Sequence, residues 1–321
     1  MKKFLALVLL LAAGLAIGLW FIQGWNGAGP STRPTPVVIA SGTSLVEAAG
    51  QLEKAGVIAS AERFLLQAKL FGGSESIKAG EYEFPAHASH SQVLALLQDA
   101  KTLQRMVTIP EGLPSVLVHE RLMKAAALTG EVPVPEEGSI LPNSYSYQRG
   151  EARSAVVRRM QAAMARALAR MWARRSPSTV VKTPREAVIL ASIVEKETGK
   201  ASERRMIAGV YSNRLRQGIK LDADPTVIYP ITKGRPLGRR INQSELHSKN
   251  GYNTYAMAGL PAGPIANPGK ESIAAVLNPA ATRALYFVAD GTGGHVFADT
   301  LAQHNANVAK WFAIRRARGE M

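Results

Sequence analysis

The sequence has no cysteine and far fewer acidic than basic residues. Without a thiol, it excludes disulfides, zinc–thiolate sites and cysteine nucleophiles. The 321 residues include 24 Asp and Glu against 39 Lys and Arg, a formal net charge of +15. An excess of this size indicates a polyanionic partner or an anionic membrane surface, so nucleic acid is the first candidate to consider. The hydrophobic content of 46% is ordinary for a folded protein, and the length is typical of about two domains.

The common motifs of metal, cofactor and serine chemistry are also missing. The histidines are scattered, with no ligand spacing such as HExxH. The glycines of residues 290–297 lack the sequence context of a phosphate-binding loop, and they predict the loop of a hairpin instead. No GxSxG nucleophile elbow occurs. We therefore expect neither a metal ion nor a cofactor.

One long hydrophobic run occurs near the start, at residues 4–22. It carries no charge, follows Lys2 and Lys3, and as a helix would span the ~30 Å hydrocarbon core of a bilayer. A cleaved signal peptide would end in a small-x-small site, whereas this run ends in the bulky residues 19–22. We therefore predict an uncleaved, single-pass helix in the inner (plasma) membrane, with residues 1–3 cytoplasmic and the rest extracytoplasmic. An exported domain meets cell wall and lipid, which disfavours nucleic acid.

Composition and periodicity divide the remaining chain into a linker and two folded units. Residues 23–36 are rich in Gly, Pro, Ser and Thr and predict the linker. Residues 37–105 alternate strand-like and helical patterns, which is typical of a small α+β module, and residues 106–321 form the larger unit. In that unit, residues 151–175 carry seven Arg around a stripe of Val, Met and Leu. This amphipathic helix has a basic face that is either merely solvated or in contact with anionic head groups or wall polymer.

Local signals predict the individual elements of the first unit. Ser44 and Ser60 are suitable N-cap residues for two helices, because a serine side chain can accept a backbone N–H of the first turn. The other expected elements are a strand at 37–40, a strand at 78–84 and a helix at 91–97.

A carboxylate lies at the end of a predicted buried helix. Thr183 and Pro184 form an N-cap and first-turn pair, and the residues that follow are almost wholly apolar. Glu197 lies four residues after Ile193 and continues the apolar stripe, whereas Glu195 projects from a different side. Burial would raise the pKa of Glu197 and let it act as a general acid. The alternative is that both glutamates are solvated charges near a helix end, each paired with a neighbouring Lys or Arg.

Further polar candidates lie downstream. Residues 221–226 (LDADPT) predict a turn, in which Asp222 and Asp224 could form a second catalytic group or a metal-ligand pair. Such a turn is more often structural, with Asp224 capping its own backbone. The loops 252–255 (YNTY) and 259–269 (GLPAGPIANPG) mix aromatic rings with amides and hydroxyls, which suits a carbohydrate groove, although turn formation alone would explain the Gly and Pro.

Several motifs along the chain together carry a family resemblance. They are ASIVEKET (191–198), ASERRMIAGVYSNRL (201–215), LDADPTVIY (221–229), YNTY, GLPAGPIANPG, YFVADGTGGHVF (286–297) and HN (304–305), with weaker matches KAGEYEF (78–84), IPEG (109–112) and LPNSY (141–145). In this order they resemble the YceG-like (MltG) family of endolytic murein transglycosylases. The chain departs from the family at Asn143, where members more often have Asp, and the basic segment 230–251 does not map onto the pattern.

The resemblance implies an α+β fold made of an N-terminal transmembrane helix, a LysM-like subdomain (37–105) and a mixed α/β catalytic domain (106–321). It implies a lytic transglycosylase that cleaves the MurNAc–GlcNAc bond within nascent peptidoglycan strands, forms 1,6-anhydro-MurNAc ends and terminates strand elongation. Expected partners are peptidoglycan strands, membrane lipid and peptidoglycan synthases of the elongation machinery. The competing interpretation is a non-catalytic protein that binds peptidoglycan as a scaffold of the wall machinery.

The resemblance also implies site residues. The catalytic glutamate falls in EKET, at Glu197, with Glu195 in reserve. The residues expected to bind substrate are Asn213, Asp224, Thr226, Tyr252, Asn253, Thr254 and Tyr255.

Overall fold

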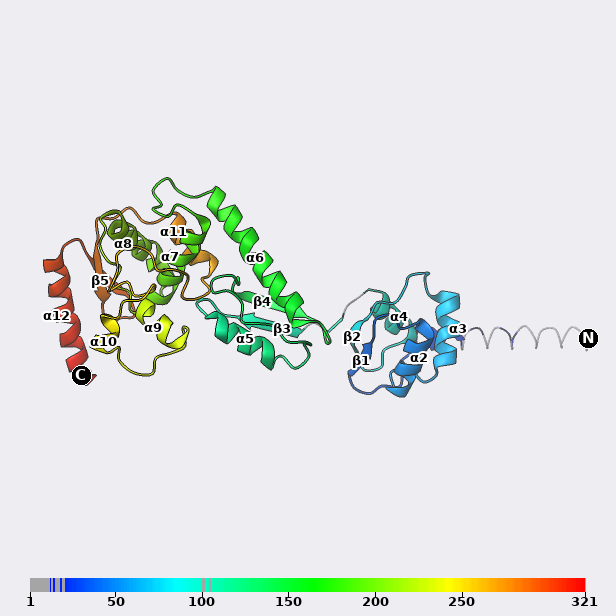
Figure 1. The fold of residues 1–321 in the computed structure, drawn as a ribbon. Helices are drawn as coiled ribbons and strands as arrows, with labels where there is room; N and C mark the ends of the chain where they lie inside the picture. The colour runs from blue at the N-terminus through cyan, green and yellow to red at the C-terminus, as the bar shows by residue number, and fades with distance from the viewer. Residues whose placement is uncertain are drawn as a thin grey trace, which may run out of the picture. The chain divides into compact units, whose positions relative to one another are not determined.

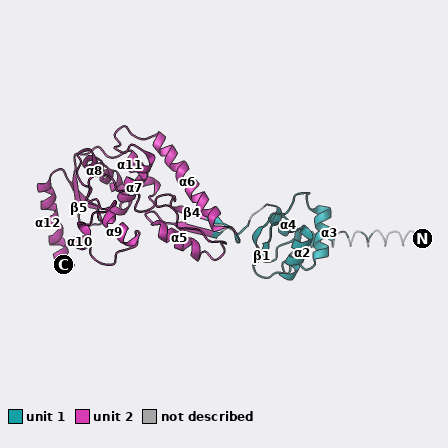
Figure 2. Cartoon of the chain, in the orientation of Figure 1, with its two compact units in different colours: residues 1–105, 146–150 teal, residues 106–145, 151–321 magenta. Residues whose placement is uncertain are grey.

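The computed structural model (Figure 1) describes residues 21–99, 102, 103 and 105–320, together with positions 12, 14 and 18. Most of the predicted membrane span at 4–22 lies outside these residues. Within the described part of the chain, no helix combines the length and apolarity needed to cross a bilayer. The chain divides into two compact units (Figure 2), residues 1–105 with 146–150 and residues 106–145 with 151–321.

The first unit packs helices onto a two-stranded antiparallel sheet. Its elements are β1 (Thr35–Ile39), α2 (Leu45–Lys54), α3 (Ala61–Phe71), β2 (Gly80–Phe84) and α4 (His90–Gln98). Val37 pairs with Tyr82 across the sheet, and Phe64 of α3 is fully buried in the core beneath it. The serine N-caps are confirmed, since Ser44 and Ser60 each accept a backbone N–H from the first turn of their helix.

The boundary between linker and first unit differs from the prediction. Strand β1 begins at Thr35, two residues before the predicted start of the module. Upstream of it, Gly29 donates its N–H to the His87 carbonyl, and His87 donates its own to the carbonyl of the buried Ser31. The second half of the predicted linker is therefore held by main-chain hydrogen bonds. This order depends on a tertiary contact with the segment around His87. The Gly and Pro content of residues 23–36 predicts a linker and gives no sign of that contact.

The second unit is mainly helical. Its elements are β3 (Arg105–Ile109), α5 (Ser115–Lys124), β4 (Asn143–Tyr147), α6 (Arg153–Ala173), α7 (Pro184–Glu197), the 3-10 helix η1 (Ala201–Glu203), α8 (Arg204–Arg216), α9 (Asp224–Thr232), α10 (Gln243–Leu246), α11 (Lys270–Leu277), β5 (Tyr286–Ala289), β6 (His295–Ala298) and α12 (Leu301–Ala317). The first residue of β3 and the last two of β4 are counted in the first unit. Strand β3 pairs with β4, and β5 with β6 in an antiparallel hairpin, as predicted from the glycine-rich loop. The expected mixture of helices with small strands is thus confirmed, whereas the LysM-like character of the first unit stays a prediction.

Helix α7 forms the centre of this unit. It packs against α6, α8, α9 and α11, and the eight residues 187–194 are all buried. The predicted N-cap is present, because the Thr183 side chain accepts the Glu186 N–H and Pro184 occupies the first turn. A helix enclosed in this way has little freedom to move, so the side chains at its C-terminal end are held rigidly.

The predicted turn at 221–226 is instead the start of a helix. Asp222 has a left-handed backbone (φ 50°), which reverses the chain, and α9 then begins at Asp224 with Pro225 in its first turn. The expectation that Asp224 caps its own backbone is wrong, since α9 has no side-chain cap. The Asp224 side chain is thereby free for a different partner.

Candidate active site

A cavity of about 690 Å³ lies at the C-terminal end of α7. It is lined by polar side chains from separate parts of the sequence, with aromatic and aliphatic neighbours. The polar and aromatic lining residues are Glu197, Tyr211, Arg214, Asp222, Asp224, Tyr255, Tyr286, Phe287, His304 and Phe312. A concave site that combines several titratable groups with aromatic rings is the usual form of a site for a small polar ligand such as a sugar.

Glu197 has the surroundings expected of a general acid. Its Oε1 is buried and has no hydrogen-bond partner in the described part of the chain. Burial raises its pKa to about 7, although a hydrogen bond from Tyr211 opposes the rise and the charge of Asp224 adds to it. A carboxyl group with a pKa near neutrality can both give and take a proton at working pH.

Glu195 is occupied in holding the fold together. Its side chain is 5% exposed, and its Oε2 accepts the backbone N–H of Gly269 at 2.8 Å. Its Oε1 lies 3.5 Å from a guanidinium nitrogen of Arg204. Gly269 is the N-cap residue of α11, so Glu195 ties α11 to α7. The alternative that both glutamates are solvated is wrong, because Glu195 is 5% exposed and Oε1 of Glu197 is buried. Its pairing with a neighbouring Arg is confirmed for Glu195, which lies beside Arg204.

Asp224 and Tyr255 form a pair in the same cavity. The Tyr255 hydroxyl donates to Asp224 Oδ1 at 2.6 Å, although 31 positions separate the two residues. Burial, with the nearby Asp224 carboxylate, raises the pKa of Tyr255, so its hydroxyl stays protonated and can only be a donor to that carboxylate. These two predicted substrate-binding residues therefore do lie together with Glu197.

The predictions did not include three other residues of the cavity lining, Arg214, Tyr286 and His304. Arg214 contacts Asp222 Oδ2 at 2.6 Å, and its guanidinium carbon lies 5.5 Å from the ring centroid of Tyr286. The His304 ring stacks on Tyr286 with a centroid separation of 5.2 Å. Burial and the charge of Arg214 lower the pKa of His304, so this imidazole is neutral near pH 7. One sequence signal was available, since Arg214 lies three residues after Tyr211 and is thus a charge on the buried face of α8.

Three predicted sugar-binding residues are buried and satisfied within the protein. The Asn253 amide donates to the carbonyls of Glu245, Leu246 and Ser248. The hydroxyls of Thr226 and Thr254 lie 2.8 Å apart, and Thr254 also accepts the Ala223 N–H. All three are fully buried, so none has a polar atom directed to the cavity. They hold the loop that carries Tyr255 against the start of α9.

Two other predicted residues also lie outside the cavity lining. The Asn213 amide donates to the carbonyls of Thr282 and Ala284, which attaches α8 to the chain before β5. Tyr252 packs on Tyr229, with ring centroids 4.9 Å apart. Among the described residues, no cluster of three or more acidic or histidine side chains has the arrangement of a metal site.

The chain as a whole is similar to known proteins. The sequence model of the YceG-like family matches residues 37–310, most of the chain. The protein belongs to the YceG-like family.

The family membership agrees with individual relatives. A protein of Streptococcus pneumoniae named "Endolytic murein transglycosylase" is 27% identical over 96% of this chain, and the chain spans 64% of that protein's length. A Bacillus subtilis protein of the same name is 39% identical over 39% of the chain and 34% of its own length. The crystal structure of a yceG-like protein from Listeria monocytogenes superposes with a TM-score of 0.55 at 26% identity, covering 86% of this chain and 99% of that one.

Proposed function

We propose that this YceG-like chain is a lytic transglycosylase that cleaves the MurNAc–GlcNAc bond within peptidoglycan strands and leaves 1,6-anhydro-MurNAc ends. The observation that carries the proposal is Glu197, a buried carboxyl group with its pKa raised to about 7, in a cavity lined by polar and aromatic side chains. The names of the S. pneumoniae and B. subtilis relatives support the same reaction.

One carboxyl group suffices for this chemistry. Protonated Glu197 gives its proton to the glycosidic oxygen as the bond from that oxygen to the anomeric carbon of MurNAc breaks. The C6 hydroxyl of the same MurNAc attacks the anomeric carbon and closes the anhydro ring. Glu197, now a carboxylate, takes the proton that this hydroxyl releases, so no water is consumed. A glycoside hydrolase would need a second carboxylate, as nucleophile or as base for water.

The other cavity residues have supporting roles in this proposal. The Tyr255 hydroxyl holds Asp224, and the negative charge of Asp224 helps to keep the proton on Glu197. Arg214, Tyr286 and His304 contribute a guanidinium and two stacked rings to the lining, which suits the mixed polar and apolar surface of pyranose rings. In this proposal four of the predicted sugar ligands instead support the site from within the protein: Asn213, Thr226, Asn253 and Thr254. Tyr252 packs on Tyr229 outside the cavity lining.

The proposal includes the surroundings of the enzyme. We propose that residues 4–22 anchor it in the inner membrane, that residues 37–105 form a LysM-like module, and that the strand-cleaving unit meets nascent peptidoglycan near its synthases. The apolar run after Lys2 and Lys3 and the excess of basic charge support this placement. Fractionation of cells that express the full chain, with protease access from the outer face, tests the topology.

The chemical identity of the new glycan end tests the reaction. Purified strands are incubated with the wild-type chain, Glu197→Gln and Glu195→Gln, and the products are analysed by mass spectrometry. We expect anhydro ends from the wild type and a loss of at least about 100-fold in Glu197→Gln, since general acid–base groups contribute roughly 10²–10⁴. Reducing ends would indicate a hydrolase that uses Asp222 or Asp224 as its second carboxylate. Unchanged strands with retained binding would favour the non-catalytic scaffold.

A further inference from the structure

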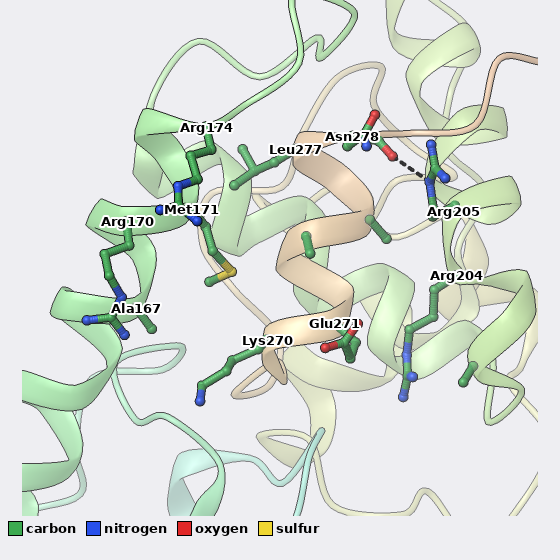
Figure 3. Close-up of a pocket in the computed structure, with 13 residues that line it drawn as sticks. Ala167, Arg170, Met171, Arg174, Arg204, Arg205, Lys270, Glu271, Leu277 and Asn278 are labelled. Atoms are coloured by element: carbon green, nitrogen blue, oxygen red, sulfur yellow. Dashed lines mark hydrogen bonds between the residues drawn. The ribbon is translucent and has the colours of Figure 1, made fainter.

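A second cavity, of about 510 Å³, lies among α6, α8 and α11 and shares no lining residue with the candidate active site. Figure 3 shows Arg170 and Arg174 on α6, Arg204 and Arg205 on α8, and Lys270 at the start of α11 between them. Five cationic side chains thus border a single hollow, in which Glu271 is the only acidic residue.

Three of the five cations that line this cavity have no partner among the residues that the structure describes. Arg204 lies near Glu111 and Glu195, and Arg205 donates to the Asn278 carbonyl. Across the part of the chain that the structure describes, by contrast, the side chains of Arg170, Arg174 and Lys270 make neither an ion pair nor a hydrogen bond. Five cations around one hollow outnumber the single carboxylate in its lining, and such an excess produces a local positive potential that attracts an anion. Guanidinium groups in particular hold carboxylate or phosphate through paired hydrogen bonds.

The cavity also has an apolar side, which narrows the class of ligand. Ala167, Ala275 and Leu277 are buried, and Met171 lies beside them, pointing toward α11 in Figure 3. A bare hydrated anion would gain nothing from these groups. A short peptide with carboxylates and small aliphatic side chains would use both the basic and the apolar parts.

We infer that this cavity binds the carboxylate-bearing peptide stem of a glycan strand, apart from the site that holds the sugars. The inference rests on the proposed function, because it takes peptidoglycan as the substrate. Stem peptides are short, end in small aliphatic residues and carry several free carboxylates, which matches the lining.

The cavity is connected to the catalytic helix by direct contacts. Arg204 borders the cavity and lies 3.5 Å from Glu195 Oε1. Glu195 in turn accepts the N–H of Gly269, next to Lys270, and precedes Glu197 by two residues on α7. A stem held in the cavity would therefore rest on α8 and α11. Both of these helices pack against α7, which carries Glu197.

Calorimetric titration of the full chain tests the inference. Glu197→Gln serves as the background so that no ligand is consumed, and the probe is a disaccharide–tetrapeptide muropeptide. Arg170→Ala with Arg174→Ala removes two unpaired cations, whereas Arg158→Ala with Arg166→Ala makes the same change on exposed parts of α6 outside the cavity. A second probe has its stem carboxylates amidated, and a third is inorganic phosphate.

We expect the variant that lacks Arg170 and Arg174 to bind the muropeptide at least about tenfold more weakly, because charge-assisted hydrogen bonds are stronger than neutral ones. The control variant should bind with the affinity of the Glu197→Gln background. Amidation of the stem carboxylates should weaken binding to that background by a similar factor. Equal binding by both variants, or equal binding of the amidated probe, would overturn the inference. Competition by phosphate at the same concentration as the muropeptide would also overturn it, in favour of a phosphate site.

The two proposals fail separately. If the wild-type chain forms anhydro ends while muropeptide binding is indifferent to Arg170 and Arg174, only the stem site is wrong. If no anhydro ends form but binding still depends on these residues, only the reaction is wrong and the site stands.

Discussion

Glu195 and Glu197 lie on one helix, yet Glu195 accepts the Gly269 N–H at 2.8 Å, whereas Oε1 of Glu197 is buried with no hydrogen-bond partner in the described chain. Their positions on α7 differ by about 200° around the helix axis, since each residue advances the helix by roughly 100°. One carboxylate therefore joins α7 to α11, and the other faces the cavity. This separation makes the effects of the two glutamates distinguishable by mutation.

Replacing Glu195 by Ala should destabilise the protein. The change removes the acceptor of the Gly269 N–H and leaves Arg204 with one carboxylate partner fewer, which costs about 2–4 kcal/mol for a buried charged group. Urea denaturation followed by circular dichroism measures the loss. The matched control is Lys196→Ala at the exposed neighbouring position, with an expected change within about 0.5 kcal/mol. A Glu195→Ala protein as stable as the wild type would contradict the tie between α7 and α11.

The stability of the folded chain should depend on pH through Glu197. Its folded pKa is about 7 against a usual 4.5, so the folded state holds this proton more tightly than the unfolded state. The contribution is fully present below pH 4.5 and is lost as the pH rises to 7, by up to about 3 kcal/mol. Other groups titrate too, so the quantity to measure is the free energy of unfolding of wild type minus that of Glu197→Gln across this range. A difference that does not fall with rising pH would show that Glu197 is not desolvated.

Asp224→Asn should move the pH–rate profile. Activity requires protonated Glu197, so it should fall above about pH 7, and the charge of Asp224 is one cause of this high pKa. Removing that charge should shift the falling limb of kcat/KM to lower pH. Asp222→Asn is the control, because Asp222 is paired with Arg214 and does not contribute to the Glu197 shift. Equal shifts in both variants would indicate a general electrostatic effect.

Asn253→Ala distinguishes a supporting residue from a sugar ligand. It removes the amide that satisfies three main-chain carbonyls, so we expect a loss of about 3 kcal/mol and a clearly lower Tm. A sugar ligand would instead show a raised KM with an unchanged Tm. Tyr255→Phe is the useful comparison, because it removes one hydrogen bond to Asp224 in the cavity and should lower activity with only about 1 kcal/mol of lost stability.

The sequence predicted where several helices begin, because the start of a helix depends on residues that are close together in the chain. The caps at Ser44, Ser60 and Thr183 involve contacts within one helical turn, so neighbouring residues suffice to specify them. The same is true of Glu197, whose place on the apolar stripe of α7 follows from helical periodicity alone. The motifs that surround it pointed to the family before any geometry was known.

The sequence by itself thus determined the helix that carries Glu197 and the family to which the chain belongs. Only the tertiary structure decided which polar residues face the cavity. Asn253 and Thr254 lie in a loop whose composition suggests exposure, yet they are buried, because main-chain carbonyls and Thr226 from other segments enclose them. Tyr255 meets Asp224 from 31 positions away. Such pairings depend on how separate helices pack against one another, and no periodicity within a single segment carries that information.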